Sequence, residues 1–381
     1  MERADPAGRA VGEGAGVRYG LDANPIFRTR GGIGHYAARI ADRMSALSPG
    51  DEFFLYCWGV DALPDDPWLT RGNVVVRRTP KSSFSAAVRA DGVDVFHGTN
   101  FRLRARGRRG SVVSIHDLAV RIFPELRRRW VGDWIGHWKS ARDAGRADRV
   151  IAISERTADD IVRYMGVPRE KIRVTLLAAG EEFLPDKDEG KIRGLLARMG
   201  MTRPRYILFA STLEPRKNVR TLLEAYLSLR PRFPDLGLVL AGRPGWKSEK
   251  TEEFIRDHGL SADVRITGGL SAGDLALLYS HAAVFVLPSL YEGFGMPPVE
   301  AMACGAPVIV SDGGSLPEVV GDAAIVVPHD DADRFRREID RVLTSPALAA
   351  ELREKGFRRA ACFSWDRVAA ETLAVYREVT G

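Results

Sequence analysis

The stretch from Ala283 to Gly305 constrains the fold of this chain more than any other part of its sequence. It opens with a short, continuous apolar run over residues 283–288, which is typical of a buried strand in a parallel sheet. Pro297 and Pro298 then favour the first turn of a helix, and Gly305 can end that helix. A buried parallel strand followed at once by a helix predicts an α/β architecture.

The loop between this strand and helix predicts a ligand site. Gly293 and Gly295 allow the backbone to approach a ligand closely, with the amides of these residues and of Phe294 facing it. The N-terminus of the helix adds partial positive charge. Glu292 on the strand side and Glu300 in the first helical turn flank the loop, at the edge where open α/β sheets bind ligands. In the alternative interpretation, Glu292 is only solvated and Glu300 only complements the helix dipole.

Composition indicates a globular protein with two domains. The chain has 381 residues, of which 45% are hydrophobic and 28% charged. Its three cysteines show no C-x-x-C spacing, so we expect neither disulfides nor a zinc site, and a cytoplasmic setting. We expect residues 1–16 to be a flexible tail, because they lack the apolar centre of a signal peptide. No apolar run approaches the length of a membrane span.

The same alternation of strand, loop and helix runs through both halves of the chain. It predicts two Rossmann-like, doubly wound domains that face a central cleft. We expect residues 1–185 to form the first domain and 186–363 the second, with a charged connection over 181–205. Apolar runs that predict strands lie at 17–23, 53–58, 74–76, 93–96, 111–115 and 150–153, then at 206–210, 236–241, 264–267, 283–287, 307–310 and 324–327.

Several expected strand ends carry residues suited to ligand binding. Residues 31–34 (G-G-I-G) follow the first strand and precede a helix, so they form a candidate phosphate-binding loop. Two consecutive strands end in a histidine, His97 and His116, and Asp117 follows the second. The alternatives are an ordinary tight turn at 31–34, structural histidines, and a capping role for Asp117.

In the second half, Arg216 and Lys217 lie between a strand end and a helix that Asn218 is expected to cap. Cationic side chains at this position can bind a diphosphate.

Asp186 and Asp188 form a D-x-D pattern, but they lie in the expected connection between the domains. We therefore interpret the pattern as a coincidence and expect no metal site.

Positive charge is concentrated in the first half. Residues 1–180 hold 30 Lys and Arg against 21 Asp and Glu, whereas the remainder holds 26 against 29. We expect the first half to meet something anionic, such as a phosphorylated acceptor, a membrane surface or a nucleic acid.

In the helical stretch 123–149, Trp130, Trp134 and Trp138 recur every fourth residue and share one helix face. We favour a core-facing aromatic stripe; the alternative is peripheral contact with the inner face of the cell membrane.

Together these motifs resemble the retaining nucleotide-sugar glycosyltransferases of family 4, which have the GT-B fold. The resemblance covers nearly the whole chain. Its most specific mark is the pair Glu292 and Glu300 with seven residues between them. Supporting motifs are G-G-I-G at 31–34, S-I-H-D at 114–117, E-P-R-K-N at 214–218 and S-D-G-G-S-L-P-E at 311–318.

The resemblance implies roles in the second domain. Arg216 and Lys217 would bind the diphosphate of a nucleotide-sugar donor, and Glu300 would accept hydrogen bonds from its ribose. Glu292, with the amides of Gly293, Phe294 and Gly295, would hold the donor sugar and its phosphate. The family implies no metal or other cofactor.

The resemblance also implies roles for the first domain. His116 would contact the sugar from the opposite domain, and would be catalytic together with Glu292 and Lys217. The loop that holds Gly32 and Gly34 would close over the diphosphate or the acceptor. The last helix, from Ser364, would cross back to complete the first domain.

The S-I-H-D-L and G-R-P-G-W segments look like bacterial mannosyl- and rhamnosyltransferases of surface-polysaccharide assembly. We therefore expect a hexosyltransferase that uses GDP-mannose, with a glycan or lipid-linked acceptor and no nucleic-acid partner. With no carboxylate placed as a nucleophile, we expect front-side transfer with retention. The alternatives are a sugar-nucleotide epimerase on the same architecture, a GT-B binding protein without activity, and a basic nucleic-acid-binding protein.

Overall fold

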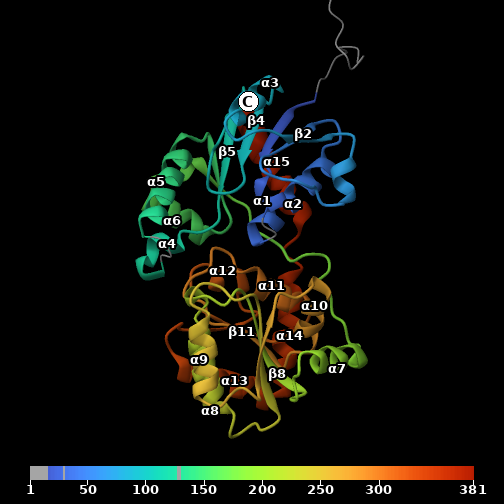
Figure 1. The fold of residues 1–381 in the computed structure, drawn as a ribbon, viewed down its shortest axis with the longest axis vertical. Coiled ribbons are helices and arrows are strands. Elements are labelled where there is room, and N and C mark those ends of the chain that lie inside the picture. The colour runs from blue at the N-terminus through green and yellow to red at the C-terminus, as the bar shows by residue number, and fades with distance from the viewer. Residues whose placement is uncertain (1–15, 29–30, 127–129) are drawn as a thin grey trace, which may run out of the picture. The chain divides into compact units, whose positions relative to one another are not determined.

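Two parallel β-sheets organise the chain, as Figure 1 shows for the computed structural model. The structure describes residues 16–28, 31–126 and 130–381. The expected N-terminal tail, apart from Gly16, and the arginines at 127–129 lie outside the described residues. The side chains of Trp130 and Val131 lie outside them too.

The first sheet has seven strands in the order β3-β2-β1-β4-β5-β6-β7. Chain order therefore reverses direction between β1 and β4, which pair in parallel through residues 19–21 and 95–97. In open α/β sheets, ligands bind at such a switch point, outside the carboxyl ends of the strands. The strands are β1 (Arg18–Asp22), β2 (Glu52–Cys57), β3 (Val74–Arg78), β4 (Val95–Gly98), β5 (Gly110–Ile115), β6 (Arg149–Ala152) and β7 (Ile172–Val174).

The second sheet has six strands in the order β10-β9-β8-β11-β12-β13. Its switch point lies between β8 and β11, which pair in parallel through residues 207–208 and 284–285. The strands are β8 (Arg205–Ala210), β9 (Leu236–Ala241), β10 (Val264–Gly268), β11 (Val284–Leu287), β12 (Val308–Ser311) and β13 (Ile325–Val327). Both sheets thus have the doubly wound topology that the alternation predicts.

Helices connect the strands and cover the sheets; in Figure 1, α8 and α9 lie on one side of the second sheet and α10 and α14 on the other. The first helices are α1 (Asn24–Arg28), α2 (Gly32–Leu47), α3 (Phe84–Ala90), α4 (Ala119–Ile122), α5 (Trp130–Arg146), α6 (Glu155–Met165) and α7 (Glu189–Arg198). The others are α8 (Val219–Leu229), α9 (Glu249–Asp257), α10 (Ala272–His281), α11 (Met296–Ala303), α12 (Leu316–Val320), α13 (Ala332–Thr344), α14 (Pro346–Ala360) and α15 (Trp365–Thr380).

Contacts divide the chain into two compact units. The first contains residues 1–114, 143–151 and 369–381, and the second contains 115–142 and 152–368. The expected boundary at 185–186 falls between the last strand of one sheet and the first strand of the other. The second unit, however, also takes in residues 115–142 and 152–185, so it includes His116.

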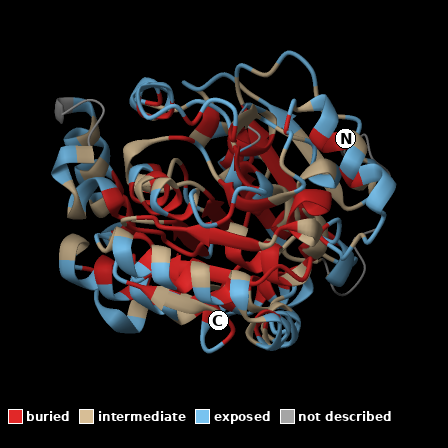
Figure 2. Cartoon of the chain, turned by 90° about the horizontal axis from the view of Figure 1, so that it is seen from below, coloured by how far each residue is buried: buried red, intermediate tan, exposed pale blue. Residues whose placement is uncertain are grey.

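Each unit has its own buried core. Figure 2 draws the buried residues in red. In the first unit, the rings of Tyr56, Phe84 and Phe96 pack at tilted or edge-on angles with centroids 5.6–6.2 Å apart. In the second, every residue of β9 is buried, as expected for a parallel strand that is covered on both faces.

Buried hydrogen bonds tie the C-terminal helix into the first unit. The ring of His97 bonds the Tyr376 hydroxyl through Nδ1 (2.7 Å) and the Ser114 hydroxyl through Nε2 (2.8 Å). Ser114 also bonds the Tyr36 hydroxyl at 2.8 Å. His97 is fully buried, so of the alternatives for the two histidines the structural one holds for His97.

Two expectations about surface segments are wrong. Trp134 and Trp138 are 58% and 54% exposed, so they are not part of a core-facing stripe. The expected connection contains α7, which Asp188 caps by accepting from the amides of Gly190 and Lys191. Three apolar residues of α7 are buried in the core of the second unit, and its two glycines obscure this pattern in the sequence.

Candidate functional site

The predicted site residues of the second unit gather at the switch point of its sheet. Arg216 and Lys217 follow β8 in a short 3₁₀ turn (Pro215–Lys217), and Glu292 follows β11. Because β8 and β11 are neighbours, the two loops emerge side by side at the same sheet edge. Topology alone therefore brings Lys217 and Arg216 close to Glu292, although they are 75 and 76 positions apart from it in sequence.

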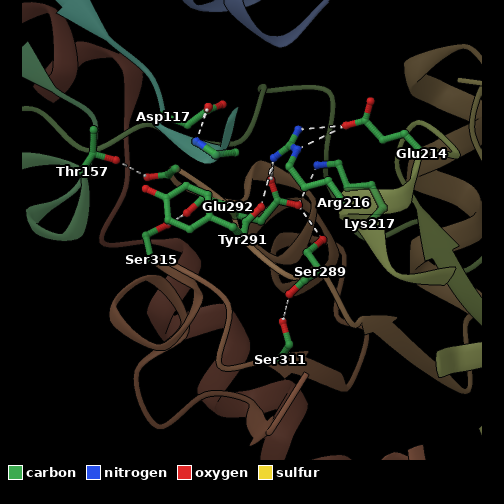
Figure 3. Close-up of polar contacts among 12 residues, drawn as sticks. Asp117, Thr157, Glu214, Arg216, Lys217, Ser289, Tyr291, Glu292, Ser311 and Ser315 are labelled. Carbon is green, nitrogen blue, oxygen red and sulfur yellow. Dashed lines mark hydrogen bonds and ion pairs between the residues drawn. The ribbon is translucent and has the colours of Figure 1, made fainter. Parts of the chain in front are cut away.

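A buried carboxylate and two cations form the centre of this site (Figure 3). Lys217 Nζ lies 2.6 Å from Glu292 Oε1, and Arg216 Nη1 lies 3.1 Å from Glu292 Oε2. The Ser289 hydroxyl donates to Glu292 Oε1 at 2.6 Å. The side chains of Lys217 and Glu292 are only 9% and 8% exposed. Below them, the Ser311 hydroxyl donates to the Ser289 carbonyl, which fixes the end of β11.

These contacts keep Glu292 ionised. Burial alone would raise its pKa, but Lys217 and Arg216, with the hydrogen bonds from Lys217 and Ser289, together lower the pKa to about 2. Both carboxylate oxygens already accept hydrogen bonds. Glu292 is therefore a poor base and a poor nucleophile at neutral pH.

The charges of the site are close to balanced. Arg216 also contacts Glu214 Oε1 (3.1 Å), and its pKa is raised, although burial opposes this, by the charges of Glu292, Asp117 and Glu214. Burial and the charge of Arg216 lower the pKa of Lys217. Among the described residues the Lys217 ammonium donates only to Glu292, which leaves two N–H groups for a ligand.

The loop at 293–295 supplies backbone donors. The amides of Gly293, Phe294 and Gly295 donate to no described residue. Gly295 has φ +90° and immediately precedes α11, whose dipole adds positive charge at this end. The Phe294 side chain is buried edge-on against Phe363, so only its backbone can meet a ligand.

His116 lies beside this loop. A Cβ atom at Gly293 would come within 1.8 Å of the His116 carbonyl oxygen, so the close approach of the two segments requires glycine. On the other side, the Gly293 carbonyl accepts from the Ser154 (2.7 Å) and Thr157 (3.1 Å) hydroxyls of the α6 N-terminus. Asp117 accepts from the amide of Ala119 at 3.1 Å, as its capping alternative predicts.

Glu300 differs from expectation in position and in charge. It lies beyond the first turn of α11, which contains no acidic residue, so it does not simply complement the helix dipole. It accepts from the Tyr279 hydroxyl at 3.1 Å. Burial raises the pKa of Glu300 to about 7; the Tyr279 hydrogen bond opposes this shift and the charge of Glu182 adds to it.

The glycine loop of the first unit forms a helix start. Gly31 takes the N-cap position of α2, so Gly32 and Gly34 lie in its first turn. A Cβ atom at Gly31 would meet nothing within 4 Å, so its surroundings are open. None of the three glycines has positive φ.

Sequence reasoning assigned no role to Glu214, Ser289 or Ser315. Glu214 binds Arg216, Ser289 binds the Glu292 carboxylate, and Ser315 donates to the Glu292 carbonyl through its amide (3.0 Å) and hydroxyl (3.1 Å). Glu214 and Ser315 belong to motifs quoted above, and Ser289 lies two residues beyond the end of β11. Position at a strand end could therefore have suggested all three.

Other candidate features carry no chemistry of their own. Asp186 and Asp188 serve the start of α7, and no group of three or more His, Cys, Asp or Glu side chains suited to a metal occurs in the part of the chain that the structure describes. Asn218 has φ +53° and donates to the carbonyls of Pro288 and His329 rather than capping α8 with its side chain. No helix among the described residues combines the length and apolar character needed to cross a bilayer.

Comparison with known proteins places this geometry in a family. Residues 30–175 match the family described as Glycosyltransferase Family 4, and residues 200–359 match Glycosyl transferases group 1. The O-antigen chain mannosyltransferase B of Escherichia coli is 32% identical over 289 residues, which cover 74% of each chain. The serotype-specific mannosyltransferase WbdA of Escherichia coli is 37% identical over 59% of this chain, which spans only 28% of that larger protein.

A solved structure shares the fold. Sucrose-phosphate synthase from Thermosynechococcus elongatus superposes with a TM-score of 0.78 at 22% identity, covering 95% of this chain and 98% of that one. Three findings indicate the same family. They are the two sheets with their switch points, the family matches in both halves of the chain, and the similarity to a mannosyltransferase over most of its length. The chain belongs to the family 4 glycosyltransferases and has their GT-B fold of two Rossmann-like domains.

Proposed function

We propose that this glycosyltransferase transfers mannose from GDP-mannose, with retention, to a glycan or lipid-linked acceptor of a surface polysaccharide. The observation that carries the proposal is the buried cluster of Glu292, Arg216 and Lys217 beside three amides that donate to no described residue. The similarity to mannosyltransferases of O-antigen synthesis supports the choice of sugar.

The residues of the cluster have different roles in the transfer reaction. Breaking the anomeric C–O bond leaves negative charge on the diphosphate, and Lys217, Arg216 and the amides of 293–295 stabilise that charge. Glu292 holds the sugar hydroxyls and orients both cations, while His116, beside Gly293, contacts the sugar. Gly32 and Gly34, in the first turn of α2, contribute to binding of the donor diphosphate or the acceptor.

Glu292 is not suited to act as a nucleophile, which favours front-side transfer with retention. With a pKa of about 2 and both oxygens occupied, it does not attack the anomeric carbon. We propose instead that the acceptor approaches from the face that the diphosphate leaves. A leaving phosphate oxygen then takes the proton of the acceptor hydroxyl. Charge on the diphosphate is met by protein groups alone, so we propose that no metal is needed.

The alternative functions draw less support from the described residues. The arginine-rich segment 102–109 suggested a nucleic-acid partner, yet four of its five arginines pair with carboxylates of their own unit. The pairs are Arg102–Asp143, Arg104–Asp22, Arg106–Asp148 and Arg108–Asp94. An epimerase would interconvert a sugar nucleotide without any acceptor, so an acceptor-free assay separates it from a transferase.

A panel of nucleotide sugars tests the proposal. We expect GDP-mannose to raise the melting temperature more than GDP-glucose, UDP-glucose or dTDP-rhamnose, since only a ligand of the folded state stabilises it. GDP release should require an acceptor and persist in EDTA. Stabilisation by UDP sugars alone would overturn the choice of donor, and loss of transfer in EDTA would overturn the metal-free mechanism.

Glu300 gives the site a pH dependence. An ionised carboxylate is the better acceptor for ribose hydroxyls, and with a pKa of about 7 its ionised fraction rises about tenfold between pH 6 and 8. We therefore expect the KM for the nucleotide sugar to fall by up to about tenfold over this range. In Glu300→Gln, KM should be high and nearly constant.

The intact sugar nucleotide is the right ligand for this measurement, because its diphosphate has no terminal phosphate that titrates near neutral pH. Stability provides a second readout. Because the folded pKa of Glu300 is raised above 4.5, stability falls as the pH rises from about 4.5 through 7, and Glu300→Gln should lack this decline. A pH-independent KM in the unmodified protein would contradict the role of Glu300.

We also propose that the enzyme is cytoplasmic and binds peripherally to anionic membranes through α5. Trp134, Ile135 and Trp138 are 58%, 40% and 54% exposed on this helix. Lys139 and Arg142 lie exposed on neighbouring turns, and the Arg142 guanidinium lies 5.6 Å from the Trp138 ring centroid. Exposed tryptophan beside basic residues suits the interface of an anionic bilayer, where a lipid-linked acceptor would be held.

Vesicle flotation tests this membrane contact. We expect flotation with vesicles that contain phosphatidylglycerol, weaker flotation with phosphatidylcholine alone, and loss of flotation in the double variant Trp134→Ala with Trp138→Ala. Leu184→Ala, which removes an apolar side chain that is 65% exposed elsewhere, is the matched control and should float normally. Unchanged flotation of the double variant would show that α5 is not the contact.

A further inference from the structure

A cavity of about 200 Å³ lies in the first unit, and none of the residues proposed above to bind the donor lines it. Residues beyond three strand ends contribute to it: Asp22 ends β1, Trp58 follows β2 and Asn100 lies beyond β4. These three strands are neighbours, and β1 and β4 enclose the switch point of the first sheet. The cavity therefore occupies the position at which an open α/β sheet binds its ligand.

The walls of the cavity are built from fixed polar groups. Asp22 is buried and accepts from the amide of Asn24 at 3.2 Å and from Arg104 Nε at 3.1 Å. The Arg104 guanidinium lies 4.8 Å from the centroid of the Trp58 ring. Each of these side chains is held by another, so the wall is preorganised before any ligand arrives.

The side chain of Asn24 has one hydrogen-bond donor without a partner among the described residues. Its Oδ1 accepts from the Trp58 amide at 2.9 Å, which fixes the orientation of the side-chain amide. Its Nδ2 is buried and has no hydrogen-bond partner among the described residues. A buried donor without a partner is costly, and such a group in a cavity wall is explained most simply by a ligand or water that accepts from it.

The cavity carries one cation in excess. Arg104 is neutralised by Asp22, whereas Arg28, at the end of α1, is exposed and has no ion-pair partner among the described residues. Carboxylate and amide groups beside an indole ring recognise hydroxyl-rich rings, and a guanidinium recognises phosphate with two parallel hydrogen bonds. The lining thus matches a sugar that bears a phosphate.

We propose that this cavity binds the acceptor of the reaction through a glycosyl phosphate, with Arg28 on the phosphate and Trp58, Asn24 and Asn100 around the sugar. The inference rests on the proposed transferase function and adds the chemical class of its acceptor. The same chemistry occurs in a free sugar phosphate and in the sugar next to the diphosphate of a lipid-linked glycan, and the experiment separates these two sources.

Calorimetric titration of the full chain provides the test, with mannose 1-phosphate, methyl α-mannoside and a mannosyl diphosphate on a short prenyl chain as probes. We expect at least one phosphorylated probe to bind, and Arg28→Gln to weaken it about tenfold or more, as loss of a charge-assisted contact implies. Methyl α-mannoside should bind more weakly and equally to both proteins. Arg28 is exposed, so its replacement should not affect folding, and Arg89→Gln on α3 is the matched control.

The outcomes distinguish this inference from the proposed function. Binding of mannose 1-phosphate assigns a free sugar phosphate, whereas binding of the prenyl compound alone assigns the lipid-linked source. If GDP-mannose binds normally but Arg28→Gln and Trp58→Ala bind every phosphorylated probe as the unmodified protein does, the cavity is not the acceptor site. If Arg28→Gln instead weakens GDP-mannose, the cavity belongs to the donor and the inference is also wrong. Failure of every nucleotide sugar to bind would remove the proposed function itself.

Discussion

Lys217→Ala should lower the turnover of glycosyl transfer roughly 100- to 1,000-fold, the usual cost of removing one preorganised donor from developing negative charge. The ammonium of Lys217 is almost fully buried and keeps two N–H groups available for a ligand. Its loss removes a cation from the place where the leaving diphosphate gains charge. Initial rates of GDP release with saturating acceptor measure the effect.

The same substitution should also lower stability, because it leaves the buried Glu292 carboxylate with one cation instead of two. Breaking a buried ion pair typically costs about 3–5 kcal/mol, and here Arg216 and Ser289 offset part of that cost. Rates must therefore be measured on protein shown to be folded by circular dichroism. Lys355→Ala is the matched control, since it breaks ion pairs with Glu351 and Asp322 outside the site and should retain full activity. Normal turnover in folded Lys217→Ala would refute the charge-stabilisation account.

Glu292→Gln should have opposite effects on two quantities: it should strengthen binding of the nucleotide and lower the rate of transfer. Removal of this carboxylate makes the cluster more positive by one charge and releases both cations toward a diphosphate. At an effective dielectric constant near 20 a single charge a few ångströms away is worth about 2–4 kcal/mol, so GDP should bind about tenfold more tightly or better. Transfer should fall at least about 100-fold, because the donor sugar loses the group that orients it.

Calorimetry with GDP and initial-rate kinetics measure the two effects on the same protein. In the absence of nucleotide, Glu292→Gln should melt at a lower temperature, because Lys217 and Arg216 then repel each other without a carboxylate between them. GDP should restore much of that loss. Glu224→Gln, which removes the partner of Arg220 on the surface of α8, should change neither quantity. Weaker GDP binding in Glu292→Gln would show that the cluster does not face the diphosphate.

The cluster of Arg216, Lys217 and Glu292 was predictable because its residues lie at strand ends. Apolar runs located β8 and β11, and the polar residues directly after them had to emerge at the same edge of a parallel sheet. This places Arg216, Lys217 and Glu292 together without knowledge of side-chain packing. The sequence predicted that Gly293 and Gly295 allow a close approach to the backbone, but we expected a ligand there, whereas the group next to Gly293 is the carbonyl of His116.

Burial and pairing were not predictable from the sequence. The three tryptophans share a helix face by spacing, but spacing does not say whether that face is covered, and Trp134 and Trp138 are exposed. His97 lies near the end of β4 and His116 directly follows β5, yet only the fold shows that His97 bonds Tyr376 of the C-terminal helix. The raised pKa of Glu300 results mainly from burial, which the sequence does not reveal, and the hydrogen bond from Tyr279 on another helix opposes it.

The most direct test of the donor site is a crystal structure with bound GDP. The account predicts phosphate oxygens within hydrogen-bonding distance of Lys217 Nζ, the Arg216 guanidinium and the amides of residues 293–295, with the ribose hydroxyls on Glu300. A nucleotide bound elsewhere, with the contacts of Glu292 to Lys217 and Arg216 intact and its phosphates remote from all three residues, would contradict it.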